Sequence, residues 1–283
     1  MIGQQKLIEQ IDDLIEKEKF PRFSIVVGEK GMEHEDVARY VACKMNCIYV
    51  ELPDVKVDTV RIMIQQAYKY HADTVFCIPN ADDMSINAKN AMLKVVEDAP
   101  NKAYFIMCLE DLSNTLATIQ SRGIVFNMCR PTTDEIAEFA RELYVNKEDI
   151  KEDIIEKKAM ICSTAGDVVY FTHHDINNFY NYAEYVAENV VKMSGAEVFT
   201  LTNKLAIKDE EDKYDCRLFL LTLQEVYRQR INRINDAQEV VCIWSMIATI
   251  GQYLQDLKIK GVNRAMLLDN LWLELRRVWK SQM

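Results

Sequence analysis

The chain has 283 residues, of which 49% are hydrophobic and 28% charged, with a formal net charge of -10. This length can bury one large core or several modest ones, and the acidic balance argues against a protein whose whole surface binds nucleic acid. Charged residues interrupt the chain near Met1, and no later stretch reaches the roughly 18 uncharged residues of a membrane helix. We therefore expect a cytoplasmic protein without membrane contact.

The cysteines indicate reduced, mostly buried thiols, because the eight of them lack the dense, regular spacing of a disulfide framework. Cys43 and Cys47 form the only close pair, and no second pair follows at zinc-ribbon spacing. We therefore expect no metal site.

The first half of the chain alternates helical and strand patterns, as a parallel α/β sheet does. In chain order, the pattern predicts a helix with the stripe Leu7, Ile11, Leu14 and Ile15, a strand at Phe23–Val27, a helix over 33–45, a short apolar run at Ile48–Leu52, a helix over 59–70, a strand at Thr74–Ile78, a helix over 88–96, and strands at Tyr104–Leu109 and Ile124–Asn127.

Strand signals fade after Arg130-Pro131, and the rest of the chain is predicted to be helical. Thr133 and Asp134 stand where a helix N-cap would, and Gly166-Asp167 is interpreted as a turn between two helices. The last helix should present one apolar face made of Leu268, Leu271, Trp272, Leu275 and Val278.

Four separated segments of the first 130 residues carry a family resemblance. They are Ile2-Gly3-Gln4-Gln5 with Phe20-Pro21-Arg22-Phe23, Val57-Asp58-Thr59-Val60-Arg61, Ala88 to Pro100, and Thr118-Ile119-Gln120-Ser121-Arg122-Gly123. In this order they resemble the clamp-loader branch of the AAA+ proteins, and within it the bacterial delta-prime type of subunit. The resemblance implies a parallel-sheet α/β AAA+ core at 1–130, a small helical lid domain at 131–186 and a helical collar, or oligomerisation, domain at 187–283.

The loop after the first strand departs from a working phosphate loop, which needs a lysine for the terminal phosphates and a hydroxyl for magnesium. Gly28 and Gly31 are kept, and Lys30 lies too early in the loop to serve as that lysine. The positions of the third glycine, the lysine and the hydroxyl are occupied by Glu33, His34 and Glu35. These carboxylates should repel polyphosphate and DNA alike.

The second catalytic strand is altered too, because Pro79 and Asn80 replace the magnesium-orienting aspartate and the water-activating glutamate of the family. We interpret Asp82 and Asp83 as a turn or helix cap, and His34 as a solvated helix start. The resemblance thus implies a degenerate site that holds no nucleotide cofactor.

The pair Ser121-Arg122 survives in this sequence. Members of the family project this arginine from one subunit into the nucleotide site of the next, so the resemblance implies that Arg122 acts in trans. The alternative is a structural arginine that bonds a helix end.

The leading hypothesis is a non-ATPase, delta-prime-like subunit that supplies Arg122 to ATPase clamp-loader subunits. Its other partners would be the clamp-opening subunit and, through the complex, the sliding clamp and primer-template DNA. Two alternatives remain: a divergent ATPase that uses Lys30, and a repurposed interaction protein of a phage or mobile element. The four-cysteine zinc module common in the family is absent between His34 and Val75.

Overall fold

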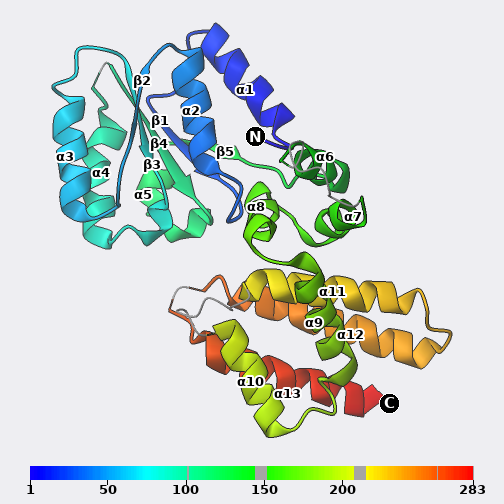
Figure 1. Ribbon diagram of the computed structural model, residues 1–283. Helices are drawn as coiled ribbons and strands as arrows, with labels where there is room; N and C mark the ends of the chain where they lie inside the picture. Colours follow the sequence, from blue (N-terminus) through cyan, green and yellow to red (C-terminus); the bar gives the residue numbers. More distant parts are fainter. Residues whose placement is uncertain (101, 144–151, 207–214, 260, 283) are drawn as a thin grey trace. The chain divides into compact units, whose positions relative to one another are not determined.

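The computed structural model describes residues 1–100, 102–143, 152–206, 215–259 and 261–282 (Figure 1). The chain divides into two compact units. Unit 1 comprises residues 1–142 and 163–168, and unit 2 comprises residues 143–162 and 169–283. None of the helices in the described ranges has the length and apolar character needed to cross a membrane.

Unit 1 is built on a five-stranded parallel sheet with the strand order β2-β3-β4-β1-β5. The strands are β1 (Phe23–Val27), β2 (Ile48–Glu51), β3 (Thr74–Ile78), β4 (Ala103–Leu109) and β5 (Ile124–Asn127). Strand β3 is buried along its whole length, as expected for a parallel strand covered by helices on both faces.

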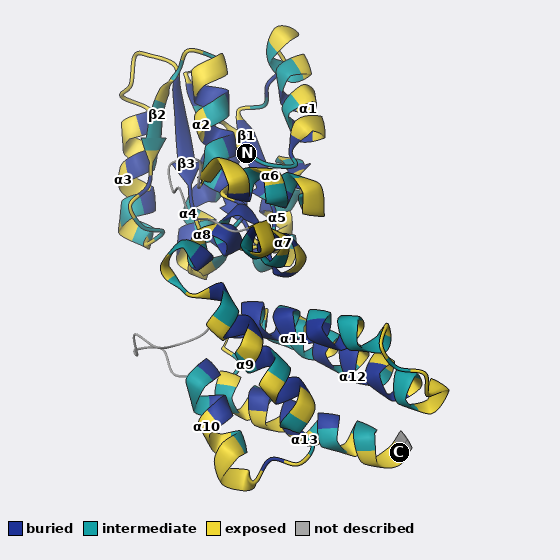
Figure 2. Ribbon diagram, turned by 45° about the vertical axis from the view of Figure 1, so that its right-hand side comes forward, coloured by how far each residue is buried: buried dark blue, intermediate teal, exposed yellow. Residues whose placement is uncertain are grey.

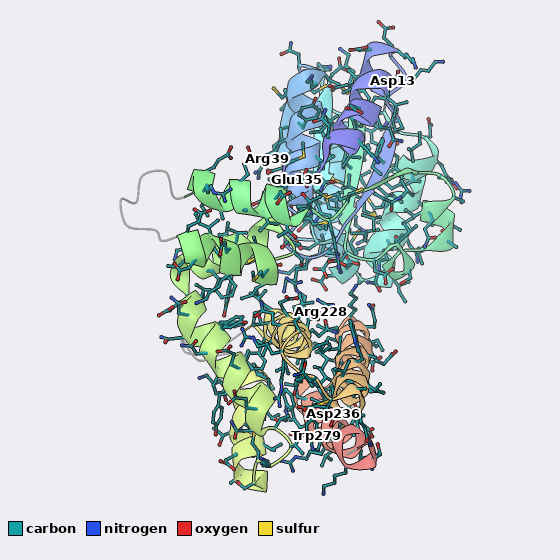
Figure 3. The ribbon with its side chains drawn as sticks, turned by 90° about the vertical axis from the view of Figure 1, so that its right-hand side faces the viewer. Asp13, Arg39, Glu135, Arg228, Asp236 and Trp279 are labelled. Atoms are coloured by element: carbon teal, nitrogen blue, oxygen red, sulfur yellow. The ribbon has the colours of Figure 1, made fainter. Side chains whose placement is uncertain are left out.

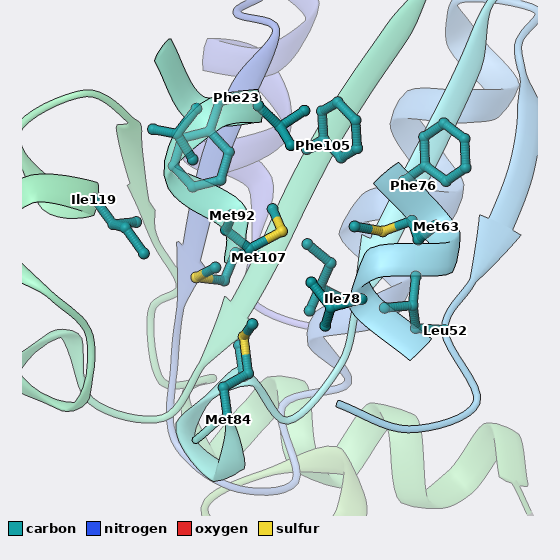
Figure 4. Packing of buried hydrophobic residues seen from close by; sticks show 14 of the residues in the cluster. Phe23, Leu52, Met63, Phe76, Ile78, Met84, Met92, Phe105, Met107 and Ile119 are labelled. Atoms are coloured by element: carbon teal, nitrogen blue, oxygen red, sulfur yellow. The ribbon is translucent and has the colours of Figure 1, made fainter. Parts of the chain in front are cut away.

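Helices α1 (Gln5–Glu16) and α2 (His34–Lys44) cover one face of this sheet, while α3 (Val57–Ala67), α4 (Ile86–Glu97) and the short α5 (Ala117–Gln120) cover the other (Figure 1). The side chains of successive strand residues therefore pack into the cores on opposite faces of the sheet. Val26 packs with the α1 and α2 side, while Ile25 packs with the α3 and α4 side. Figure 4 shows the second core, in which Phe76 and Phe105 stack with ring centroids 5.2 Å apart.

The helix α6 (Thr133–Leu143) begins one residue earlier than the sequence pattern indicated, because Thr132 is its cap. The hydroxyl of Thr132 accepts a hydrogen bond from the backbone N–H of Glu135. In return, the carboxylate of Glu135, labelled in Figure 3, accepts from the N–H and hydroxyl of Thr132. This is a reciprocal capping box.

The predicted turn at Gly166-Asp167 is wrong, since both residues lie in the first turn of α8 (Ala165–His173), which follows α7 (Glu152–Ile161). The carboxylate of Asp167 accepts hydrogen bonds from the backbone N–H groups of Ser163 and Thr164, and the hydroxyl of Thr164 accepts from the N–H of Asp167. The aspartate thus closes the start of a helix, and the turn lies just before it.

In unit 2, α11 (Cys216–Ile231) packs on α9 (Ile176–Asn189) and α12 (Ala237–Asp256), and α13 (Arg264–Gln282) packs on α10 (Gly195–Ala206) and α12. Figure 2 shows that the buried residues of these helices face one another. Leu268, Leu271, Trp272 and Leu275 are fully buried, as their spacing predicted, whereas Val278 of the same predicted face is half-buried. The indole N–H of Trp272 donates to the hydroxyl of Thr202 over 3.2 Å, and that hydroxyl donates to Asp269.

The expected division into three domains remains a prediction. Its boundary between residues 186 and 187 falls inside α9, which continues to Asn189. The sequence of this helix has no glycine or proline that would mark a break, and Phe179, Ala183 and Val186 are buried along one face of it.

Replacing Trp272 with alanine is expected to lower the free energy of unfolding by about 3–5 kcal/mol, because it empties a fully buried site and removes the donor to Thr202. The matched variant Trp244→Ala should change it by less than about 0.5 kcal/mol, because Trp244 is 52% exposed. Urea unfolding followed by tryptophan fluorescence reports on unit 2, where all three tryptophans lie. Equal shifts for both variants would contradict this packing.

Candidate functional site

The loop between β1 and α2 is folded back on itself. His34, the first residue of α2, is only 8% exposed, and its Nε2 donates to the carbonyl oxygen of Gly28 over 2.8 Å. The expectation of a solvated helix start at His34 is therefore wrong, because the imidazole turns inward and caps a carbonyl of the loop. A Cβ at Gly28 would lie 3.1 Å from this nitrogen and 2.9 Å from the Cβ of Met128, so only glycine leaves room for the ring.

Two other segments of unit 1 hold the loop. The guanidinium of Arg130 donates to both carboxylate oxygens of Glu29, over 2.9 and 2.6 Å. The carbonyl of Gly31 accepts from the backbone N–H of Gly166 over 2.9 Å, and a Cβ on Gly166 would lie 2.8 Å from the Cα of Gly31. Gly31 has a φ of +87°, which favours glycine. The loop is thus fixed by contacts of the chain with itself.

Beside the loop lies a hollow of about 10 Å³. It is lined by Ile2, Gln4, Met32, Glu33, Pro131 and Ala165. This is about the room that one water molecule needs, whereas pockets for nucleotide-sized ligands measure some hundreds of Å³. The side-chain amide of Gln4 closes the hollow, since it bonds both the carbonyl and the N–H of Cys129.

Negative charge gathers around this loop. Desolvation and the nearby charge of Asp36 raise the pKa of Glu33. Desolvation and Asp82 also raise the pKa of Glu110, although Lys30 and His34 lower it. An approaching anion would be repelled by these carboxylates in their ionised form. Lys30 is exposed and Glu35 half-buried, so the loop brings one lysine together with several carboxylates.

Pro79 follows β3 and is buried, and Asn80 is exposed with a φ of +48°. The next residues, Ala81–Asp83, form the short 3-10 helix η1. The carboxylate of Asp82 reaches across to the segment after β4 and accepts from the N–H groups of Glu110 and Asp111 over 2.7 and 3.2 Å. The predicted turn is present, and its aspartate joins two segments about thirty residues apart.

Ser121 and Arg122 follow α5 and are exposed. The guanidinium of Arg122 donates from Nη1 to the carbonyl of Thr118 over 2.8 Å, and its Nη2 lies 3.1 Å from a carboxylate oxygen of Glu97. The first contact fits the structural alternative, and the side chain stays 39% exposed. Gly123 stands where the resembled motif has cysteine, and a Cβ there would lie 2.7 Å from the ring of Phe23.

Strand β1 separates Arg122 from the loop. Arg122 precedes β5, whose first residue, Ile124, pairs with Ser24 at the amino end of β1, whereas the loop begins at the carboxyl end of β1. A strand of this length spans roughly 13 Å. The structure therefore does not bring Arg122 together with the loop residues Gly28, Lys30, Gly31, Glu33, His34 and Glu35.

The sequence reasoning missed Arg130, Gly166 and Glu97. Arg130 follows β5, and the carboxyl ends of parallel strands meet at one edge of a sheet, so its nearness to the loop could have been inferred from topology. The sequence around Gly166 and Glu97 did not indicate these contacts, because the partners lie far away in the chain.

The fold is a five-stranded parallel α/β sheet followed by a helical carboxy-terminal region. It is similar to the Thermotoga maritima RuvB Holliday junction branch migration motor, with a TM-score of 0.52 at 16% identity, over 80% of this chain and 78% of that one. A family model described as "DNA polymerase III, delta subunit" matches residues 50–132, which include Arg122.

Among curated proteins, DNA polymerase III subunit gamma of Buchnera aphidicola subsp. Schizaphis graminum is 20% identical over 92% of this chain and 74% of its own length. DNA polymerase III subunit delta' of Yersinia pestis is 33% identical, but over only 27% of this chain and 24% of its own length. The chain is thus similar to gamma and delta' subunits of DNA polymerase III, to the first over most of its length and to the second over about a quarter of it.

The wild-type chain and the double variant His34→Lys, Glu35→Ser are both expected to lack ATP turnover. The variant regains a lysine and a hydroxyl, but Pro79 and Asn80 still supply neither the metal ligand nor the base. Phosphate release measures turnover, and equilibrium binding of labelled ATP with magnesium measures affinity. Micromolar binding by the wild-type chain, or robust turnover by the variant, would contradict the interpretation of the site as degenerate.

Proposed function

We propose that this chain is a non-ATPase, delta-prime-like subunit of a clamp loader that supplies Arg122 in trans to the nucleotide site of a neighbouring ATPase subunit. The observation that carries the proposal is the position of Arg122 at the opposite end of β1 from the loop of its own chain. An arginine there is out of reach of a nucleotide in this subunit, and its side chain is 39% exposed.

The closed loop supports the non-ATPase part of the proposal. His34 occupies the space beside Gly28, Arg130 holds Glu29, and Gly166 lies against Gly31. A nucleotide would have to break these contacts and approach a group of carboxylates. Both the steric and the electrostatic terms therefore oppose binding.

The chemistry of a guanidinium supports the trans role. Its planar donors stabilise the negative charge that spreads over a phosphoryl group during transfer, which is worth about 10³–10⁵ in rate. Thr118 and Glu97 engage Nη1 and Nη2 of Arg122, and neither contact uses Nε. Donor capacity thus remains for a phosphate that a neighbour presents.

Assembly would rest on unit 2. Helix α12 carries no charged residue between Glu239 and Asp256, and its Val241 and Trp244 are 58% and 52% exposed. Such an uncharged surface with an exposed aromatic anchor is typical of subunit interfaces. In this proposal it contributes to the collar that joins the chain to the ATPase subunits and the clamp-opening subunit, and through them to the sliding clamp and primer-template DNA.

The variant Trp244→Asp is expected to remain folded but to lose entry into the assembly, because it places a charge on this exposed face. Co-expression with the ATPase subunits, followed by size measurement, reports assembly. The control Phe199→Asp changes an aromatic residue on α10 that is 65% exposed, and this variant should assemble normally. Full assembly of the Trp244 variant would exclude α12 from the interface.

The variant Arg122→Ala should preserve folding and assembly, while clamp- and DNA-stimulated ATP hydrolysis at the one site it faces falls sharply. Arg122→Lys should rescue poorly, since an ammonium lacks the planar, two-point contact of a guanidinium. Thermal unfolding of the isolated variant separates a catalytic loss from a folding defect. Unchanged hydrolysis in a fully assembled loader would remove the trans role and leave a structural subunit.

Two other functions have distinct outcomes in these experiments. A divergent ATPase that uses Lys30 would bind ATP as an isolated chain. A repurposed interaction protein would co-purify with neither the ATPase subunits nor the sliding clamp.

A further inference from the structure

The carboxylate of Asp82 organises the segment that follows β4. It accepts from the backbone N–H groups of Glu110 and Asp111, over 2.7 and 3.2 Å, and from the side-chain amide of Asn114, over 2.9 Å. An ionised carboxylate that accepts several N–H donors holds them more strongly than a neutral acceptor would. Asp82 therefore fixes the conformation of residues 110–114, which we call the bracket.

The bracket is also tied to α4 and α5. The ammonium group of Lys89 on α4 donates to the carbonyl of Asn114. The side-chain amide of Gln120 at the end of α5 donates to the carbonyls of Leu112 and Thr115, over 2.9 and 3.2 Å. Hydrogen bonds thus join Asp82 to the bracket, and other hydrogen bonds join the bracket to the helix that precedes Arg122.

Arg122 is set by α5 and α4 in turn. Its backbone N–H donates to the carbonyl of Ile119, and its guanidinium bonds the carbonyl of Thr118 in α5 and Glu97 at the end of α4. Ile119 is fully buried in the core, so α5 cannot turn about its own axis without exposing it. The direction of Arg122 therefore depends on where the bracket holds α5.

We propose that Asp82 and Gln120 are positioning residues for Arg122, which they hold ready without any nucleotide in this chain. The proposal rests on the proposed trans role of Arg122. A carboxylate that holds a metal beside nucleotide changes its partners as the nucleotide comes and goes, whereas Asp82 bonds amides of its own chain. Pro79 and Asn80 make the end of β3 unsuitable for catalysis. In this proposal, Asp82 at the same end instead orients Arg122 toward a neighbouring subunit.

Hydrogen exchange of the isolated full-length chain tests the mechanical link. Asp82→Ala is expected to speed exchange of the amides of Glu110 and Asp111, and also of the bonded amides of residues 119–123 around Arg122. The control Asp58→Ala removes the same charge from α3 of the same unit, where the side chain is 84% exposed, and should change neither segment. Loss of protection at 110–111 with none at 119–123 would overturn the link.

Steady-state kinetics of the assembled loader test the consequence. A small displacement of a reacting group costs up to about 10²-fold in rate, so Asp82→Ala should lower kcat at the faced site by about 10- to 100-fold while KM for ATP changes less than about twofold. Gln120→Leu, which keeps the volume but removes the amide, should give a smaller loss of the same kind. It also tests the proposal should Asp82→Ala fail to fold.

The double variant Asp82→Ala, Arg122→Ala decides whether Asp82 acts through Arg122. If it does, the double variant should hydrolyse ATP no more slowly than Arg122→Ala alone. Losses that multiply, or a rise in KM without a fall in kcat, would make Asp82 a structural residue. If Arg122→Ala itself has no effect, the proposed function fails; if only the Asp82 and Gln120 variants have none, this inference alone fails.

Discussion

The parallel pairing of β1 with β4 and β5 is the constraint on which the other features of unit 1 depend. Because neighbouring strands are parallel, every connection must run back from the carboxyl end of one strand to the amino end of the next. The two ends of the sheet therefore receive different loops. The carboxyl edge collects the closed loop, Asn80 and the bracket, while the amino edge receives Arg122 and the end of α4. One chain thus carries two chemically distinct ends with a buried sheet between them.

The periodic parts of this chain were predictable because their cause is local. Short, mostly apolar runs such as Phe23–Val27 and Thr74–Ile78 are typical of a covered strand, and the structure places both strands at those residues. The face of α13 was equally plain, since Leu268, Leu271 and Leu275 recur at helical spacing and are all buried. The order of the motifs predicted a likeness to DNA polymerase III subunits, and the comparisons also find that likeness.

The errors have a common physical origin, which is that a polar residue shows its type in the sequence but not its partner. His34 was expected to be solvated beside Glu33 and Glu35, but the carbonyl oxygen of Gly28 accepts a hydrogen bond from its imidazole. Gly166 was predicted to lie in a turn, but it lies in α8, and its lack of a side chain allows the helix backbone to contact Gly31. The roles assigned to Ser121 and Arg122 remain predictions, because they concern neighbours that one chain does not contain. The domain boundaries remain predictions as well.

The pairing of Arg122 with Glu97 has a consequence for selectivity. A free anion in solution must compete with a carboxylate already held 3.1 Å from the guanidinium, and a weak, transient encounter gains little from doing so. A phosphate carried by a docked neighbour is held beside the same arginine by the rest of the interface, so this contact need not supply the binding energy alone. In the proposed assembly, the ion pair therefore disfavours contact of Arg122 with dissolved nucleotide. The phosphate of a correctly docked subunit still displaces the carboxylate of Glu97.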